Sequence, residues 1–314
     1  MEKKITIAAP CYNEEMGIGA FLSALQAIGN QLEDSGYKIT FLLIDDGSTD
    51  QTLMILTDYS NTDPRIRIAS FSRNFGHQAA VSAAIDLADA NALILMDADM
   101  QHPPQCIPQM IQAWEEGHDI VSMVRQETVA QKFMKNFTSR IFYKFFNSLS
   151  DTKVANGAAD FFLLSERAQN ALKQLPEYHQ FWRGLVSWIG FNRKFIEYTA
   201  AQRAAGSSKY SISKMLGLAI DGMTSFSTKP IKVIVCVGFL TAACGALYLA
   251  YILFCAFVLK DTVHGWSSLI ATTIIIGGIQ ILVMGMIGNY TAKIFEQVKS
   301  RPRYILKKNT YSNK

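Results

Sequence analysis

Two aspartates separated by one residue are the clearest candidates for chemistry in this sequence. Asp97 and Asp99 follow the apolar run 92–96 and precede a pair of prolines. Two carboxylates at a strand end can approach one cation, and their oxygens suit Mg²⁺ or Mn²⁺, which complete their shells with phosphate oxygens. Gln101 follows closely as a third candidate ligand. An acidic loop that only solvates the strand end is the alternative, because Asp-x-Asp alone is common.

A second acidic group, Asp45-Asp46-Gly47-Ser48-Thr49-Asp50, follows the apolar residues 42–44. A glycine turn with a helix cap at Ser48 or Thr49 explains part of this pattern. It does not explain two adjacent acids after a buried strand. A carboxylate there can accept a hydrogen bond from a nucleobase N–H, and Tyr12 could stack on such a base. For Tyr12, a packed aromatic side chain is the alternative.

Both groups belong to a predicted series of alternating strands and helices. We expect strands at 5–9, 40–44, 66–71, 92–96 and 120–124, and helices at 16–32, from 49 onward and at 78–90. This alternation predicts an α/β domain with a mostly parallel sheet, which binds ligands at the carboxyl ends of its strands. The sequence lacks G-x-G-x-x-G after the first strand and lacks G-x-x-x-x-G-K-[ST]. An ordinary dinucleotide-binding fold and a P-loop ATPase are therefore excluded.

Two long apolar runs, 231–259 and 267–288, follow this domain. Each is long enough to cross a bilayer, and the short connector predicts a hairpin. A buried helical hairpin of a soluble protein is the alternative. Lysines and arginines flank the outer ends of the runs, so the positive-inside rule places both termini in the cytosol. Upstream, 211–230 has the pattern of an amphipathic helix on the membrane surface, or else of an ordinary surface helix.

Charge and cysteine content narrow the classes of partner. The chain of 314 residues has a formal net charge of +4, and residues 289–314 carry seven Lys or Arg against Glu296 alone. A basic tail beside apolar helices suits anionic lipid headgroups, whereas a nucleic-acid binder would more often be basic on its folded domain. None of the five cysteines forms a C-x-x-C pair, so neither a disulfide framework nor a zinc site is indicated.

Four motifs, in this order and spacing, resemble glycosyltransferase family 2: Pro10-Cys-Tyr-Asn-Glu-Glu15, Asp45–Asp50, Arg73-Asn-Phe-Gly76 and Asp97–Gln101. Asp160-Phe161, Arg203–Tyr210, Thr224–Ser227 and the hairpin extend the resemblance to polyprenyl-phosphate glycosyltransferases over nearly the whole chain. The resemblance implies a GT-A (Rossmann-like) domain at 1–210, an amphipathic helix at 211–230, transmembrane helices at 231–259 and 267–288, and a basic cytosolic tail at 289–314.

The resemblance also implies a role for each matching residue. The nucleotide sugar is expected at Pro10, Tyr12, Glu14, Asp45, Asp46, Arg73, Asp97 and, on a loop that closes over the diphosphate, Arg203, Ser207 and Lys209. The metal ligands are Asp97, Asp99 and Gln101, and the catalytic residues are Asp99, Asp160 and Arg203. The acceptor phosphate is expected at Arg125 or Arg140, with Lys132 and Lys135 as alternatives, because the stretch after Arg125 is less basic than in the family.

The implied reaction is transfer of a sugar, with glucose as the leading candidate, from a UDP-sugar to undecaprenyl phosphate with inversion. It would use Mg²⁺ or Mn²⁺ on the cytosolic face of the bacterial inner membrane. A tetramer, a downstream flippase and a second glycosyltransferase for O-antigen or cell-envelope modification are the implied partners. Another acceptor, such as a glycan end or diacylglycerol, and a non-catalytic membrane scaffold are the alternatives.

Gln180-Phe-Trp-Arg183 is a near match to the Gln-x-x-Arg-Trp of processive synthases. Gly184 stands where those enzymes have tryptophan, which argues against a polymerising enzyme. The start of an amphipathic helix is the alternative interpretation of these four residues.

Overall fold

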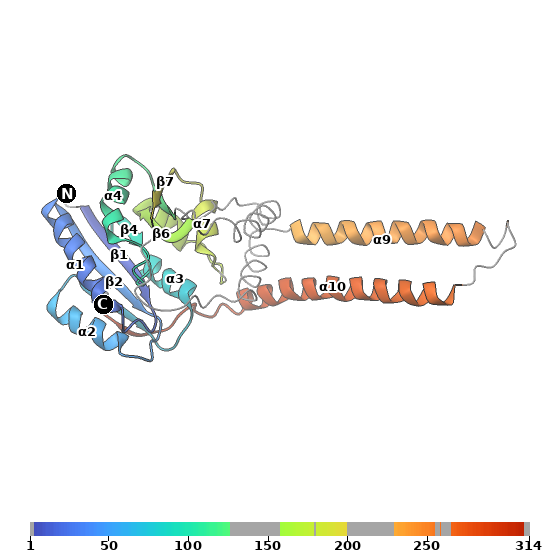
Figure 1. Ribbon diagram of the computed structural model, residues 1–314, viewed down its shortest axis with the longest axis horizontal. Coiled ribbons are helices and arrows are strands. Elements are labelled where there is room, and N and C mark those ends of the chain that lie inside the picture. The colour runs from blue at the N-terminus through green and yellow to red at the C-terminus, as the bar shows by residue number, and fades with distance from the viewer. Residues whose placement is uncertain are drawn as a thin grey trace.

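A computed structural model describes residues 3–125, 158–178, 180–199, 229–254, 258 and 265–310 (Figure 1). An α/β domain comes first, and two long helices extend away from it. The strands are β1 (Lys3–Cys11), β2 (Tyr37–Asp45), β3 (Ile66–Phe71), β4 (Ala92–Leu95), β5 (Ile120–Arg125), β6 (Ala158–Ser165), β7 (Arg193–Tyr198) and β8 (Leu306–Asn309). The helices of the domain are α1 (Ile18–Asp34), α2 (Thr52–Thr62), α3 (His77–Leu87), α4 (Ile107–Glu115), α6 (Glu166–Lys173) and α7 (Trp182–Trp188).

The centre of the sheet is parallel, as the sequence predicts. In the described part of the chain the strand order is β7-β5-β6-β4-β1-β2-β3-β8. β1 pairs in parallel with β2 and β4, and β2 pairs in parallel with β3. The carboxyl ends of these four strands therefore meet at one edge, which is where open α/β sheets bind ligands.

The two sides of the sheet contain antiparallel strands that the sequence pattern did not indicate. β6 lies between β4 and β5 and runs antiparallel to both. β8, which follows the last long helix, pairs antiparallel with the edge strand β3. The sheet is therefore mixed, with a parallel centre.

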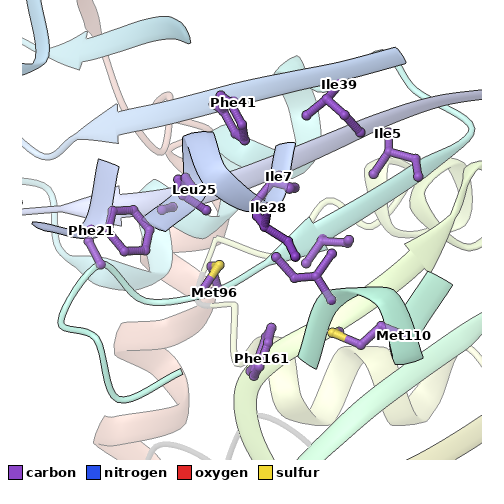
Figure 2. Close-up of a cluster of buried hydrophobic side chains, with 14 of the residues drawn as sticks. Ile5, Ile7, Phe21, Leu25, Ile28, Ile39, Phe41, Met96, Met110 and Phe161 are labelled. Atoms are coloured by element: carbon purple, nitrogen blue, oxygen red, sulfur yellow. The ribbon is translucent and has the colours of Figure 1, made fainter. Parts of the chain in front are cut away.

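Alternating residues of the strands form two cores, because successive side chains point to opposite faces. Phe21, Leu25 and Ile28 of α1 pack with Ile5 and Ile7 of β1 on one face (Figure 2). Residues of α2 and α4 join this core, whereas α3, α6 and α7 cover the other face. Both faces are thus covered, which accounts for strands that read as continuous apolar runs.

The expected cap of α2 is wrong. α2 begins at Thr52, preceded by Gln51, and not at Ser48 or Thr49. The Asp50 carboxylate accepts a hydrogen bond from the Thr52 backbone N–H (3.0 Å), while Ser48 and Thr49 bind Asn13 instead. Contacts between neighbouring loops outweigh the local capping preference here.

The two long helices, α9 (Lys229–Phe254) and α10 (Trp266–Val298), lie side by side (Figure 1). Within the described residues, only the stretch Thr272–Val298 is long and apolar enough to cross a membrane, and Ile234–Tyr248 is a shorter apolar stretch. The predicted second span is therefore found as a candidate. The first predicted span, 231–259, is not supported, because its described apolar stretch is shorter than a membrane span and the run ends outside the described part of the chain.

Candidate active site

The loops after β1 and β2 hold each other in place at the carboxyl edge of the sheet. The Asn13 N–H donates to Ser48 Oγ (3.1 Å), and Asn13 Oδ1 accepts from the Thr49 N–H (2.9 Å). The Glu14 N–H donates to Thr52 Oγ1 (2.9 Å). Asn13 is left-handed at φ 53°, a conformation that asparagine tolerates. The two predicted nucleotide loops thus form one unit.

Asp45 is fully buried at the end of β2. Its carboxylate accepts from Ser70 Oγ (2.7 Å) and from the Ser48 N–H (3.0 Å). These donors fix the direction of the carboxylate while each oxygen retains a further lone pair. Pro10 lies beside Ile44 in the parallel register, and the Tyr12 side chain just beyond is 44% exposed, which leaves room for stacking.

Asp46 is also buried, but its carboxylate shapes the next loop. It accepts from the backbone N–H groups of Phe75 (2.7 Å) and Gly76 (3.0 Å) and from Asn74 Nδ2 (3.0 Å). Burial raises the pKa of Asp46, and these backbone donors oppose that rise. The described contacts of the Asp46 carboxylate therefore hold the loop 74–76 in place. Arg73, on the same loop, is exposed, with its guanidinium 4.1 Å from the Phe75 ring centroid.

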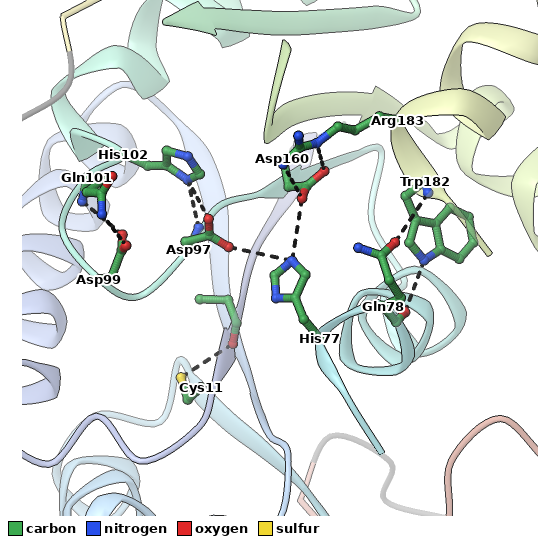
Figure 3. Close-up of polar contacts among 11 residues, drawn as sticks. Cys11, His77, Gln78, Asp97, Asp99, Gln101, His102, Asp160, Trp182 and Arg183 are labelled. Atoms are coloured by element: carbon green, nitrogen blue, oxygen red, sulfur yellow. Dashed lines mark hydrogen bonds and ion pairs between the residues drawn. The ribbon is translucent and has the colours of Figure 1, made fainter. Parts of the chain in front are cut away.

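Asp97, the first acid of the Asp-x-Asp pair, faces two histidines (Figure 3). Its backbone N–H donates to Nδ1 of His102 (2.9 Å), so that nitrogen carries a lone pair. His102 is buried and stacks on Phe161, and burial lowers its pKa. A neutral His102 therefore fixes the turn that presents Asp97. Burial raises the pKa of Asp97 as well.

Asp99, the second acid, is turned toward Gln101 (Figure 3). Its carboxylate accepts from the Gln101 N–H (3.0 Å) and Nε2 (2.8 Å), and Gln101 Oε1 accepts from Arg125 (3.2 Å). Met100, between Asp99 and Gln101, is left-handed at φ 61°. No group of three or more His, Cys, Asp or Glu side chains that could hold a metal occurs in the described ranges. Two carboxylates and an amide are nevertheless suitable donors for a hard cation that takes its other ligands from phosphate.

Asp160 lies beside Asp97 because of the register of β6. Leu95 of β4 pairs with Phe162 of antiparallel β6, so the residues beyond Leu95 run alongside those before Phe162. Arg183 of α7 donates to both oxygens of Asp160, Nε to Oδ1 and Nη2 to Oδ2, at 2.8 Å each. Although burial alone would raise it, His77 and Arg183 hold the pKa of Asp160 well below its usual range. Asp160 is therefore an ionised, oriented carboxylate.

His77 links the two acids at the start of α3 (Figure 3). Its Nε2 lies 3.8 Å from Asp97 Oδ1 and 3.6 Å from Asp160 Oδ2. Although burial alone would lower it, the carboxylates of Asp160 and Asp97 raise the pKa of His77 above its ordinary value. The site thus combines two acids, a shared histidine and an arginine at the edge of a parallel sheet.

Comparison with known proteins decides the family. Residues 6–171 match the family model described as glycosyl transferase family 2. The chain belongs to glycosyl transferase family 2. The uncharacterized glycosyltransferase YkcC of Bacillus subtilis is 39% identical over 97% of this chain and 93% of its own. The SfII prophage-derived bactoprenol glucosyl transferase of Shigella flexneri is 35% identical over 99% of each chain.

A solved structure supports the GT-A fold of this glycosyl transferase. Glucosyl-3-phosphoglycerate synthase of Mycobacterium tuberculosis, determined with Mn²⁺, UDP and phosphoglyceric acid, aligns with a TM-score of 0.50 at 13% identity. The alignment covers 71% of this chain and 76% of the synthase. The transferase therefore shares the architecture that the family resemblance predicts.

The structure brings many of the predicted residues of the transferase to one edge of the sheet. These are Pro10, Tyr12, Glu14, Asp45, Asp46, Arg73, Asp97, Asp99, Gln101, Arg125 and Asp160. Asp97 and Asp99 share a turn, but their carboxylates face different partners. Lys132, Lys135, Arg140, Arg203, Ser207 and Lys209, and the predicted amphipathic helix up to residue 228, lie outside the described residues.

The sequence did not predict that His77 and Arg183 are partners of the acidic residues of the site. His77 directly follows the Arg73–Gly76 motif, and its position at the start of a predicted helix was the available signal. Arg183 stood out only as part of a processive-synthase motif. Its partnership with Asp160 depends on β6, which periodicity did not reveal.

Proposed function

We propose that this family 2 glycosyl transferase moves a glucosyl group from UDP-glucose to a polyprenyl phosphate, with inversion. The observation that carries the proposal is similarity over 99% of the chain to a relative named bactoprenol glucosyl transferase. Bactoprenol glucosyl transferases of Shigella phages SfV and SfX are 35% and 34% identical over 97% of the chain. At this coverage, the aligned region includes α9 and α10 as well as the catalytic domain. The product would serve O-antigen or cell-envelope glycan modification, after a flippase and a second glycosyltransferase.

The donor would lie along the carboxyl edge of the parallel strands. The oriented Asp45 carboxylate would accept the uracil N–H, with Tyr12 stacked on the base. Pro10, Glu14 and Arg73 would border the nucleotide, and Arg203, Ser207 and Lys209 would close over the diphosphate. Asp97, Asp99 and Gln101 would hold Mg²⁺ or Mn²⁺, which would neutralise charge on the departing diphosphate. The Mycobacterium tuberculosis synthase of the same fold was determined with Mn²⁺ and UDP.

Asp160 would act on the sugar. Its carboxylate stays ionised beside Arg183 and His77, so it can stabilise positive charge that develops on the sugar ring in an oxocarbenium-like transition state. A phosphate acceptor is already anionic near neutral pH. No strong general base is then required, and a carboxylate with a depressed pKa, a poor base, is compatible with this role.

Arg125 is the described candidate for gripping the acceptor phosphate. It is exposed at the end of β5 and contacts Gln101, which places it close to the Asp-x-Asp turn. A guanidinium can bind phosphate through two parallel hydrogen bonds. Lys132, Lys135 and Arg140 would supply further charge from the following segment.

The long helices would hold the site at the membrane. Large apolar side chains of α9 and α10, such as Phe239 (77% exposed) and Ile281 (73% exposed), are uncovered. Apolar surface of this extent is normally covered by lipid or protein. We infer that α9 and α10 form a two-span hairpin in the bacterial inner membrane, with both termini in the cytosol. A tetramer is proposed from the family resemblance.

A transfer assay with purified full-length protein tests this function. Radiolabelled UDP-glucose, UDP-galactose, UDP-GlcNAc and GDP-mannose would each be offered with undecaprenyl phosphate and Mg²⁺ or Mn²⁺. We expect acid-labile label in the polyprenyl fraction from UDP-glucose, and its loss in Asp99→Asn with the fold retained. Acid-stable glycolipid or labelled polymer would instead indicate another acceptor, and normal turnover of Asp99→Asn would contradict its role at the metal.

A further inference from the structure

Gln297, at the end of α10 nearest the catalytic domain, attaches this helix to a loop of that domain. Its Nε2 donates to the Pro176 carbonyl (2.9 Å), and its Oε1 accepts from the Tyr178 N–H (2.7 Å). Both halves of the amide therefore bind the backbone of one loop. Gln297 stands in the last turn of α10, at the end of the stretch Thr272–Val298 that is long and apolar enough to cross a membrane.

The loop held by Gln297 leads directly into the Asp160 side of the site. It is followed by Trp182, whose indole Nε1 donates to the Gln78 carbonyl of α3 (3.1 Å) and which is only 1% exposed. The next residue, Arg183, forms the two hydrogen bonds to Asp160. A buried tryptophan therefore fixes the backbone directly before the arginine, and the attachment point at Pro176 and Tyr178 comes earlier in the same segment of the chain.

The chain after α10 attaches a second time, on the nucleotide side of the site. Tyr304 stacks on Phe71 at the end of β3, with ring centroids 5.1 Å apart. The Ser72 N–H donates to the Ile305 carbonyl (2.9 Å), and β8 then pairs with β3. β3 continues into the Arg73–Gly76 loop that Asp46 holds. The two attachments of the α10 end thus reach the two sides of the site.

We propose that this two-point attachment sets the height of the active site above the bilayer, with Gln297 as a positioning residue for the lipid-borne acceptor. The inference rests on the proposed function. A phosphate carried by a membrane lipid is confined to the headgroup level, so it meets the site only if the domain is held at a matching distance. A displacement of about 1 Å in a reacting group can reduce the rate about 100-fold.

The test compares Gln297→Ala with a matched control on the same helix, Thr291→Val, in the full-length protein. Thr291 is exposed, and its hydroxyl donates to the Ile287 carbonyl of its own helix (3.0 Å). Each variant would be assayed with undecaprenyl phosphate in vesicles of phosphatidylethanolamine and phosphatidylglycerol, and with the short, water-soluble citronellyl phosphate in detergent. Hydrogen exchange of the Tyr178 amide would be followed in parallel.

For Gln297→Ala we expect kcat/KM in vesicles to fall about tenfold, the size expected from losing two hydrogen bonds. Turnover of the soluble acceptor should stay within about twofold, because the site itself remains assembled. The Tyr178 amide should exchange faster in Gln297→Ala than in Thr291→Val. Equal losses on both acceptors, or vesicle activity equal to that of Thr291→Val, would overturn the positioning role.

Failure of the proposed function would look different. A wild-type protein that transfers sugar to neither acceptor would contradict the proposed reaction. An unchanged exchange rate at Tyr178 in Gln297→Ala would overturn the attachment, whatever the activity.

Discussion

At the scale of single residues, the ionised state of Asp160 is the feature on which the proposed chemistry depends. A carboxylate that is 9% exposed stays charged only if partners replace its hydration, and Arg183 and His77 do so here. The arginine also fixes the direction of the carboxylate, because its two donors match the two oxygens. Arg183 is therefore a positioning residue for Asp160.

Replacement of Arg183 by alanine should lower kcat about tenfold to a hundredfold, because a displaced reacting group loses its alignment. The KM for UDP-glucose should change less than about twofold, since the donor contacts remain. Arg183→Lys should recover only part of the loss, because lysine cannot form the two-donor pair. Steady-state kinetics check this, with Arg167→Ala as control: Arg167 also pairs with an aspartate, Asp119, but is 70% exposed. Equal effects of the two alanine variants would contradict the positioning role.

A second buried aspartate should govern stability in acid. Hydrogen bonds from Arg65, aided by Gln26, lower the pKa of Asp63 to about 2. Because the folded pKa is depressed, the stabilisation is complete above the unfolded pKa near 4 and is lost as the pH falls toward 2. The difference between the unfolded and folded pKa values of Asp63 corresponds to about 2 kcal/mol in the free energy of unfolding. Thermal unfolding midpoints of wild type and Asp63→Asn should differ at pH 6 and converge below pH 4; a gap that stays constant to pH 2 would contradict this.

At the scale of elements, the sequence predicted the parallel centre of the sheet and the edge at which the carboxyl ends of its strands meet. The strand at 66–71 is confirmed to the residue, and the others differ by a few residues. Apolar runs that end in acidic or polar residues made this possible, because β1, β2 and β4 are buried on both faces. The neighbours of Asp160 could not be predicted, because β6 inserts between β4 and β5, which are closer to each other in the sequence. The partners of Asp97 and Asp99 also depend on side-chain directions that spacing does not set.

Gly47, in the turn after β2, is required for two reasons: its backbone conformation and the lack of space for a Cβ atom. Gly36, in the turn before β2, has only the first of these constraints. Gly47 has φ +67°, and a Cβ there would lie 2.4 Å from the Arg73 carbonyl carbon. Gly36 has φ +89°, and a Cβ at that position would have no described atom within 4 Å, so Gly36→Ala measures the backbone strain alone. That strain should cost about 1 kcal/mol.

Gly47→Ala should therefore destabilise the protein more than Gly36→Ala and should weaken UDP binding, because the loops after β2 and β3 are forced apart. Thermal unfolding and calorimetric titration with UDP would measure the two effects. Equal unfolding midpoints and unchanged UDP affinity in Gly47→Ala would show that the loops tolerate separation.

At the scale of the whole molecule, an α/β domain with a covered core carries two helices whose apolar side chains are uncovered. β8 joins the end of α10 back to the sheet, so residues 306–309 of the predicted basic tail are part of the domain. The two apolar runs could be predicted from their length. β8 could not, because it is a short, lysine-containing strand without an apolar pattern. Its pairing comes from the open edge of β3.

Two lysine substitutions on the exposed apolar surface of α10 should release the protein from the membrane fraction. Ile281 and Met284 are 73% and 68% exposed, and a charge near the bilayer centre costs about 2.5–3.5 kcal/mol. The double variant Ile281→Lys, Met284→Lys should be depleted from a carbonate-washed membrane pellet, whereas Ile281→Ala, Met284→Ala should stay in it. Retention of the lysine variant at the wild-type level would argue that α10 is covered by protein and not by lipid.

The central claim is that the donor lies at the carboxyl edge of β1, β2 and β4, with a divalent cation at the Asp-x-Asp turn and Asp160 facing the sugar. A crystal structure of the full-length protein with Mn²⁺ and UDP tests it most directly. We predict an anomalous manganese peak bound by Asp97 or Asp99, and uridine between Tyr12 and Asp45. A nucleotide found elsewhere, with no manganese at that turn, would contradict the account.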